Sequence, residues 1–258
     1  MAQITCRFVS YTLHHGVEIE ITLPSVSSCD FGPGLSPCHT PPAPYPVLYL
    51  LHGYGNDASC WLRYTSAERY AEEHRLALVC CSVGNSFYLD RPLTDEDFFA
   101  FVGSELPEFV CGNFPISRRP EDTYLCGYSM GGYGAILHAF LEPEKYRACG
   151  FFSPGVFTDP AAKGLGAIHQ PDLTALVTEA AGSGKPLPAM FLCVGQKDFL
   201  YDRVQRFHRL LAQQRIPHRF DDLPGYEHEF SIWDLELLAL MDWLPRTDFY
   251  ADKGRHKI

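Results

Sequence analysis

The sequence predicts an α/β fold with a mostly parallel central sheet, an antiparallel N-terminal edge and helices on both faces. The main observation is that apolar, β-rich runs alternate with helical patterns along the chain, which is typical of a parallel sheet covered by helices. The exception is residues 17–23, which alternate strictly between apolar and polar and predict an antiparallel pair with residues 4–9. A length of 258 residues fits one large domain. We therefore treat residues 1–258 as a single domain.

The composition excludes several classes of protein. Hydrophobic residues make up 46% of the chain and charged residues 20%, which is not the composition of a disordered protein. No apolar run approaches the roughly 18 residues that a membrane-spanning helix needs. The formal net charge of −10 repels nucleic-acid phosphates and anionic lipid. We expect a small-molecule substrate, no nucleic-acid partner and no membrane span, and we leave a homo-oligomer open.

The N-terminus and the cysteines indicate a reducing compartment. The first ten residues lack the basic head and apolar stretch of a secretory signal. The chain has ten cysteines, several of them inside apolar runs, where cysteine behaves as a small hydrophobe. There is no CxxC pair to suggest a structural zinc site. We expect free thiols and a cytoplasmic protein; a disulfide framework after removal of an export signal is the alternative.

The strands are expected where apolar runs are short and continuous. Residues 47–53 are of this kind, as in a buried parallel strand. The stretch before them, residues 24–46, is dense in Pro, Gly and Ser and predicts a surface excursion. Further strands are expected at residues 76–83, 122–129, 149–153, 189–195 and 218–223.

The helices are expected between these strands. The pattern predicts a helix over 58–74 and another over 95–111 that Pro107 interrupts. Residues 154–188 contain too many prolines and glycines for a regular element, so we expect an irregular cap-like excursion above the sheet. The remaining helices are expected at residues 130–141, near 201–215 and at 233–244.

One motif carries the chemistry. Gly127-Tyr128-Ser129-Met130-Gly131 matches G-x-S-x-G, directly after an expected strand and at the start of an expected helix. The glycines allow a tight, strained turn that exposes the Ser129 hydroxyl, above a helix N-terminus that favours developing negative charge. A glycine-rich turn with only a packing role is the alternative. The context favours Ser129 as a nucleophile.

A serine nucleophile needs a general base. In folds with this motif the chain order is Ser, then Asp or Glu, then His, and the base must be oriented by the acid. His228 lies in a loop between the last strand and the last helix, where a base can reach over the sheet edge. The other downstream histidines are expected to be structural or to lack an orienting group: His138, His169, His208 and His218.

The expected acid is Asp198, which follows the strand at 189–195 at its carboxyl end. An ordinary helix cap is the alternative reading of an Asp before a helix. Position and chain order favour Asp198 over its neighbours Asp202, Asp221 and Asp222.

The oxyanion of such a reaction needs backbone donors. Met130 directly follows the nucleophile, and Tyr54 lies in the glycine-containing loop after the strand at 47–53. His52 in the same loop precedes Ser129 and is expected to be structural. No HExxH motif or clustered ligand spacing is present, so we expect no metal and no cofactor. Substrate contacts are expected from Gly53, Trp61, Tyr88 and Phe199.

Together these segments resemble the esterase-D-like (putative esterase) branch of the α/β-hydrolase superfamily, closest in look to tributyrin- and feruloyl-type esterases. The resemblance runs from Tyr45 to about Leu244 and includes HGYGNDASCWLRYT, GYSMGGYGA and GQKDFLY. It implies an α/β-hydrolase fold and cofactor-free hydrolysis of carboxylic esters through an acyl-serine. Ser129 would be the nucleophile, Asp198 the acid and His228 the base, with Tyr54 and Met130 as the oxyanion donors.

The specificity within this branch is less determined. S-formylglutathione hydrolases of the branch carry Thr-Cys in the oxyanion loop, where this chain has Gly55-Asn56. The segment at 158–188 looks shorter than the lid of feruloyl esterases. We therefore expect short-chain acyl esters as substrates. The alternatives are an acyltransferase, or hydrolysis of S-formylglutathione, feruloyl or acetyl esters by the same triad.

Overall fold

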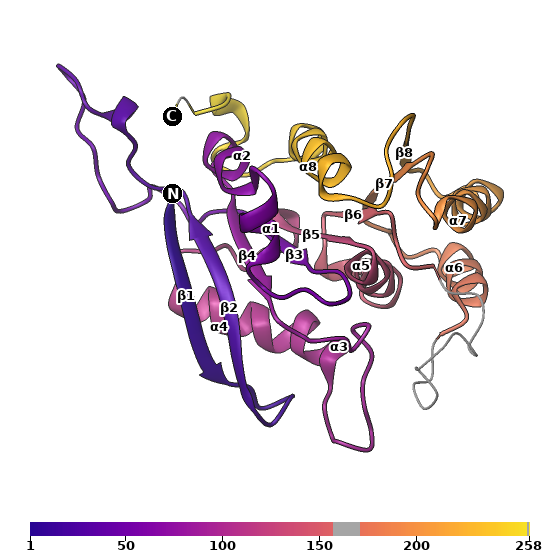
Figure 1. Ribbon diagram of the computed structural model, residues 1–258. Helices are drawn as coiled ribbons and strands as arrows, with labels where there is room; N and C mark the ends of the chain where they lie inside the picture. The colour runs from indigo at the N-terminus through magenta and orange to yellow at the C-terminus, as the bar shows by residue number, and fades with distance from the viewer. Residues whose placement is uncertain (157–170, 257) are drawn as a thin grey trace.

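The computed structural model describes residues 1–156, 171–256 and 258. Its centre is one eight-stranded sheet in the order β1-β2-β4-β3-β5-β6-β7-β8 (Figure 1). The pairs β1–β2 and β2–β4 are antiparallel and the pairs from β4 to β8 are parallel, which confirms the expected sheet. The strands are β1 (Ala2–Val9), β2 (Gly16–Leu23), β3 (Val47–Leu51), β4 (Ala77–Cys81), β5 (Thr123–Tyr128), β6 (Ala148–Phe152), β7 (Ala189–Gly195) and β8 (Arg219–Leu223).

Helices cover both faces of the sheet, as the sequence predicts (Figure 1). Side chains alternate along each strand, so Tyr49 packs into one core and its neighbours Leu48 and Leu50 into the other. One face carries α4 (Leu106–Asn113), α5 (Met130–Leu141), α6 (Leu173–Gly182) and α7 (Tyr201–Gln213). The opposite face carries α1 (Cys60–Tyr64), α2 (Ala67–His74) and α8 (Phe230–Trp243).

The expected helix over 58–74 is two helices, α1 and α2. The break falls at Thr65, whose backbone is extended (φ −135°, ψ 173°). Its hydroxyl donates to the Trp61 carbonyl at the end of α1. The backbone N–H of Ser66 donates to Asp234 of α8 at 2.6 Å. A hydrogen bond from another element thus ends one helix and starts the next, which a local pattern cannot show.

The expected interruption at Pro107 is wrong. α3 (Phe98–Ala100) continues through a π-helical segment at Phe101–Glu105 directly into α4. Pro107 is the second residue of α4, directly after the π-helical segment. The wider π turn before it changes the hydrogen-bond spacing and lets the chain stay helical across the proline.

The expected irregular excursion at 154–188 contains a helix, so that expectation is wrong for α6. Asp172 caps the helix and accepts the backbone N–H groups of Thr174 (2.9 Å) and Ala175 (3.4 Å). Leu173 and Val177 pack into the core beside α5 and α7. Residues 157–170, the rest of the expected cap, lie outside the described residues.

The parallel strands bring the predicted site residues to one edge. β3, β5 and β7 run in the same direction, so the loop after Leu51, Ser129 after β5 and Asp198 after β7 lie at the carboxyl edge of the sheet. This edge is where open α/β sheets place their ligands.

All ten cysteines are free thiols, and only Cys29 and Cys38 are exposed. In the part of the chain that the structure describes, no helix has the length and apolar character needed to cross a membrane.

Candidate active site

Ser129 forms a strained elbow between β5 and α5. Its backbone has φ 55° and ψ −115°, a conformation uncommon for a residue with a side chain. Two hydrogen bonds with the end of β6 hold it. The Ser129 N–H donates to the Phe152 carbonyl at 2.9 Å, and the Gly155 N–H donates to the Ser129 carbonyl at 2.8 Å. The last residue of β6 and Gly155, just after this strand, therefore hold the N–H and the carbonyl of the elbow residue.

The two motif glycines are required by close backbone contacts. A Cβ added at Gly127 would lie 2.3 Å from the Gly131 carbonyl oxygen. A Cβ added at Gly131 would lie 2.3 Å from the Leu51 carbonyl oxygen and 2.8 Å from that of His52. The start of α5 is thus pressed against the end of β3, which joins the elbow to the predicted oxyanion loop.

His228 and Asp198 form the predicted pair. The His228 Nδ1 lies 2.8 Å from Oδ2 of Asp198, across 30 residues of sequence. The Asp198 side chain is fully buried, while that of His228 is 17% exposed. An ionised carboxylate only accepts hydrogen bonds, so Nδ1 carries the proton and Nε2 has a free lone pair. The imidazole is therefore in the tautomer that a general base needs.

Asp198 stays ionised despite its burial. Burial alone raises the pKa of this carboxyl, but hydrogen bonds from His228, from the Leu200 N–H and from the Ser153 hydroxyl outweigh it. The Leu200 N–H lies 2.7 Å from Oδ1. The net effect is a pKa below the usual value of an aspartate.

The other candidate acids have different partners. Asp221 makes a fork with Arg219, and Asp222 accepts from Tyr201 at 2.9 Å and from Gln205 at 3.0 Å. Asp202 lies in the first turn of α7. Among the aspartates considered from sequence, Asp198 is the one bonded to His228.

The other candidate bases are engaged elsewhere. His138 is buried in α5 and lies 3.2 Å from Glu142, and burial lowers its pKa. His208 and His218 bond each other at 2.8 Å. His169 lies outside the described residues.

His52 holds the predicted oxyanion loop. Its Nδ1 donates to the Gly53 carbonyl at 2.8 Å, and its Nε2 accepts the Val83 N–H at 3.1 Å. The ring is 1% exposed, and this burial lowers its pKa. A neutral imidazole bonded on both nitrogens is structural, as expected from its place in the chain order.

Tyr54 lies at the tip of this loop. The Asn56 N–H donates to the Gly53 carbonyl at 3.3 Å, and Gly55 takes the left-handed conformation that the turn requires (φ 78°). The Gly55 N–H donates to Asn85 Oδ1 at 2.7 Å. Sequence reasoning missed Asn85, although its loop follows β4 at the same sheet edge.

Met130 is the first residue of α5. The first N–H groups of a helix have no carbonyl four residues earlier to bond, and they lie at the positive end of the helix dipole. The N–H beside Ser129 is thus placed at a helix N-terminus, as the motif predicts.

The aromatic residues predicted to contact substrate fall into two groups. Trp61 and Tyr88 are both 0% exposed. Trp61 donates to the Leu51 carbonyl at 3.1 Å, and Tyr88 donates to the His52 carbonyl at 2.9 Å. The expected role of Trp61 and Tyr88 as substrate contacts is therefore corrected. Both rings reach no solvent and support the loop after β3 through these hydrogen bonds. Phe199 is 76% exposed, and its ring centre lies 4.6 Å from that of His228.

Gly53 is held close to the site by its neighbour. A Cβ added there would lie 2.3 Å from the ring of Tyr128, the residue before Ser129. Tyr128 itself stacks on Trp233 of α8 at 4.2 Å. The loop can therefore approach the elbow only with glycine at this position.

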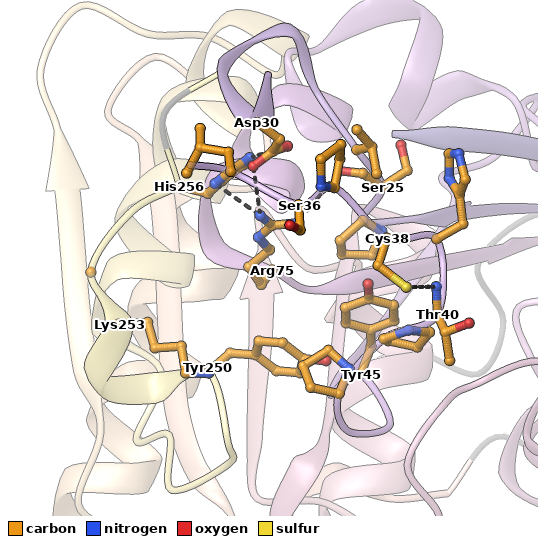
Figure 2. Close-up of a pocket in the computed structure, with 18 residues that line it drawn as sticks. Ser25, Asp30, Ser36, Cys38, Thr40, Tyr45, Arg75, Tyr250, Lys253 and His256 are labelled. Carbon is orange, nitrogen blue, oxygen red and sulfur yellow. Dashed lines mark hydrogen bonds and ion pairs between the residues drawn. The ribbon is translucent and has the colours of Figure 1, made fainter. Parts of the chain in front are cut away.

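A cavity of about 400 Å³, shown in Figure 2, has none of the predicted site residues in its lining. It is lined by the 24–45 excursion and the C-terminal segment, including Tyr250 and Lys253. Arg75 donates to His256 Nδ1 at 2.9 Å, and His256 Nε2 lies 3.3 Å from Asp30. These groups neutralise one another and dock the C-terminal segment. Within residues 1–156, 171–256 and 258, no group of His, Cys, Asp and Glu could hold a metal ion.

The sheet, the serine elbow and the buried carboxylate–histidine pair define a serine hydrolase of the α/β-hydrolase class. The family described as "Putative esterase" matches residues 32–244, and the chain belongs to this family. It is a carboxylesterase-type hydrolase.

The curated relatives and solved structures that this chain resembles include an acetyl esterase and S-formylglutathione hydrolases. An acetyl esterase of Caldicellulosiruptor saccharolyticus is 29% identical over 228 residues, covering 78% of this chain and 84% of the relative. An S-formylglutathione hydrolase of Paracoccus denitrificans (strain Pd 1222) is 31% identical over 221 residues, covering 72% and 76%. The crystal structure of S-formylglutathione hydrolase (FrmB) from Staphylococcus aureus superposes with a TM-score of 0.78 at 27% identity, covering 94% of this chain and 98% of that one.

Proposed function

We propose that this protein hydrolyses short-chain acyl esters through an acyl-serine intermediate, with Ser129 as nucleophile, His228 as general base and Asp198 as the orienting acid. The observation that carries the proposal is the 2.8 Å bond between His228 Nδ1 and the buried Asp198. This bond leaves Nε2 as the basic nitrogen at the sheet edge that bears the Ser129 elbow. A strained elbow and an oriented imidazole are the two parts that acyl transfer to serine requires.

The reaction proceeds in two halves. His228 Nε2 takes the proton of the Ser129 hydroxyl as its oxygen attacks the ester carbonyl, and the imidazolium is stabilised by Asp198. Collapse of the tetrahedral intermediate breaks the bond to the leaving alcohol, which receives that proton. Water then attacks the acyl-serine in the same way and releases the carboxylic acid. No cofactor enters this scheme.

The oxyanion of each intermediate is bound by the backbone N–H groups of Tyr54 and Met130. The contact between Gly131 and the Leu51 carbonyl supports this assignment, because it fixes the loop against the start of α5. Buried bonds from Trp61 and Tyr88 to the same loop keep it rigid. Donors that are fixed before the charge develops are the effective ones.

Two exposed aromatic residues support a small acyl group. Tyr54 (63% exposed) lies in the proposed oxyanion loop and Phe199 (76% exposed) lies beside His228, so both rings take up space next to the site. The acetyl esterase among the relatives agrees with this size. The substrate is then a small ester. Ten free thiols fit a cytoplasmic protein, which we propose with it.

The test is hydrolysis of p-nitrophenyl acetate by the wild type and by Ser129→Ala. We expect Ser129→Ala to lose about 10⁴-fold or more in kcat, with its melting temperature kept. A fluorophosphonate should label Ser129 in the wild type, and neither exposed thiol, Cys29 or Cys38. An adduct mapped to either cysteine, or near-normal turnover by Ser129→Ala, would refute the assignment.

A panel of substrates separates the alternatives. S-formylglutathione, methyl ferulate and acetyl esters are compared by kcat/KM, and an added alcohol is tested as acyl acceptor. We expect the acetyl ester to be preferred and water to be the main acceptor. Faster turnover of S-formylglutathione or feruloyl ester, or a transfer product as the main product, would move the assignment to that alternative.

A further inference from the structure

A buried serine outside the predicted triad lies between its members. Ser153 directly follows β6, the strand between β5, which bears Ser129, and β7, which bears Asp198. Its side chain is fully buried, and its N–H donates to the Cys193 carbonyl of β7 at 2.8 Å. Its neighbour Phe152 accepts the Ser129 N–H. This short segment therefore touches both the elbow and the strand of the acid.

The backbone of Ser153 is strained. Its φ is 41°, in the region that residues with a side chain rarely adopt. Strained backbone conformations of this kind cluster at functional sites. The strained backbone does not by itself identify a function for Ser153. The hydrogen bonds of the Ser153 side chain provide that evidence.

The hydroxyl of Ser153 has one proton, and the donors and acceptors around it determine the direction of its hydrogen bond. The Trp233 Nε1–H lies 3.3 Å from Ser153 Oγ and can only donate, so the oxygen accepts this bond. The Asp198 carboxylate, whose pKa is lowered by a hydrogen bond with the Ser153 side chain, only accepts. The Ser153 proton must therefore point at Asp198. The result is a relay from the indole through the hydroxyl to the carboxylate that also binds His228.

Trp233 contacts the pair a second time. Its ring meets the His228 ring edge to face, with centres 5.0 Å apart and planes at 86°. One indole thus fixes the Ser153 hydroxyl and packs against the imidazole that Asp198 orients.

We propose that Ser153 is a positioning residue of this site, which holds the Asp198 carboxylate in the orientation that His228 requires. This rests on the proposed function, because it gives Asp198 and His228 their roles. Asp198 then has donors on all sides: the Leu200 N–H, the Ser153 hydroxyl and His228 Nδ1. The titratable groups adjacent in sequence to the pair are Lys197 and Asp202 around Asp198, and Glu227 and Glu229 beside His228.

The test compares Ser153→Ala with Ser153→Gly. Both lose the hydroxyl, but alanine keeps the unfavourable φ and glycine relieves it. We expect about tenfold lower kcat for p-nitrophenyl acetate in both variants, with KM within about twofold, because a hydrogen bond to a charged group is lost. The acid limb of the kcat/KM–pH profile should move up by about half a unit, since the Asp198–His228 pair holds its proton more tightly when one donor to the carboxylate is gone.

A second measurement is independent of activity. The proton on His228 Nδ1 gives a resonance in the NMR spectrum of the ¹⁵N-histidine-labelled protein, and we expect it to shift in both variants. Ser117→Ala is the matched control, because Ser117 is a buried serine that donates to a carboxylate, Asp122, at 2.6 Å on the segment leading into β5. It should leave the acid limb and the resonance unchanged.

An unchanged acid limb and resonance in both variants would overturn the proposal, even with a lower kcat. A change in Ser153→Gly alone would assign the effect to the backbone and overturn it as well. If neither variant folds, Trp233→Phe decides, because it keeps a ring at His228 and removes the N–H that fixes Ser153. A smaller shift of the acid limb and of the resonance in the same direction supports the proposal. The absence of any shift refutes it. Inactivity of the wild type on every ester would count against the proposed function, while the resonance still tests the Ser153 contact.

Discussion

At the scale of single residues, the chemistry depends on side chains whose hydrogen bonds leave them one available state. Asp198 is ionised because donors surround it, and His228 takes one tautomer because Nδ1 faces that carboxylate. His52 is bonded on both nitrogens and so has no basic nitrogen to offer. The same residue type is therefore poised for proton transfer at one position and inert at the other.

Replacing Asp198 by Asn should lower kcat by about 10³- to 10⁴-fold, because an amide in place of the carboxylate favours the wrong imidazole tautomer. The control is Asp222→Asn. It removes a carboxylate on β8 that accepts hydrogen bonds from Tyr201 and Gln205 of α7. We expect that variant to keep at least half of the wild-type kcat. A larger loss in Asp222→Asn than in Asp198→Asn would transfer the acid role to Asp222.

The rate should also depend on pH in one direction. A general base must be neutral to accept the Ser129 proton, so we expect kcat/KM to fall when the assay is taken from about pH 8 to about pH 5. Asp198, with its lowered pKa, stays ionised over that range. Steady-state kinetics with p-nitrophenyl acetate across the range would measure this, and a flat profile would contradict a histidine base.

At the scale of elements, the end of β3, the start of α5 and the loop between β8 and α8 set the geometry. Gly131 lets α5 begin against the Leu51 carbonyl, so the elbow and the proposed oxyanion loop lie in direct contact. His228 reaches Asp198 because β8 and α8 hold both ends of its loop. These contacts join segments far apart in sequence.

Gly131→Ala should disrupt the start of α5, because the added Cβ would meet the Leu51 and His52 carbonyls at 2.3 and 2.8 Å. We expect a lower melting temperature and at least a tenfold loss of kcat/KM, since two backbone oxygens cannot both move away. Gly182→Ala is the control, because a Cβ there, at the end of α6, has open space around it. Equal effects of the two substitutions would contradict this account of the glycine.

Glu236 of α8 gives a prediction on stability. It is 4% exposed, and burial, together with the Asp221 carboxylate on β8, raises its pKa to about 8. Arg219 opposes this shift. The folded protein thus binds a proton that the unfolded chain releases near its ordinary glutamate pKa, so this group lowers stability as the pH rises from about 5 to 8.

Glu236→Gln should remove that loss. The melting temperatures of variant and wild type should agree near pH 5, and the variant should melt several degrees higher at pH 8 and above. Thermal unfolding followed by circular dichroism at several pH values measures this. A constant difference at all pH values would show that Glu236 does not carry a proton in the folded protein.

At the scale of the whole molecule, the sheet supplies a rigid edge, and we propose that the loops at this edge set the size of the substrate. The proposed site is flanked by the exposed rings of Tyr54 and Phe199, while Trp61 and Tyr88 are buried beneath the loop. The cavity between the 24–45 excursion and the C-terminal segment has none of these residues in its lining (Figure 2). Its polar groups hold the C-terminal segment in place. We therefore propose that substrate is selected at the carboxyl edge of the sheet, beside Tyr54 and Phe199.

The acyl series should show this size limit. Each methylene that is buried adds up to about 0.8 kcal/mol, roughly fourfold in kcat/KM, until the available apolar surface is filled. We expect kcat/KM for p-nitrophenyl esters to rise from acetyl to about butyryl and to fall on the order of tenfold by octanoyl. A maximum at eight carbons or beyond would indicate a deep, lipase-like acyl pocket.

The sequence by itself determined the parts that depend on local pattern and chain order. Continuous apolar runs predicted the parallel strands, strict alternation predicted the β1–β2 edge, and a five-residue motif placed Ser129 between strand and helix. The order Ser, Asp, His then selected Asp198 and His228, because parallel strands deliver their carboxyl ends to one edge. These predictions need no knowledge of which distant atoms meet.

Only the tertiary structure decided the features that rest on contacts between distant segments. The break at Thr65 depends on Asp234 of α8, and the burial of Trp61 and Tyr88 depends on how the loop after β3 folds over them. Asn85 and Ser153 carry no motif, since a lone polar residue after a strand has many uses. Their roles arise because the turn at Gly55 and the Asp198 carboxylate each need a partner that the fold brings from another strand end.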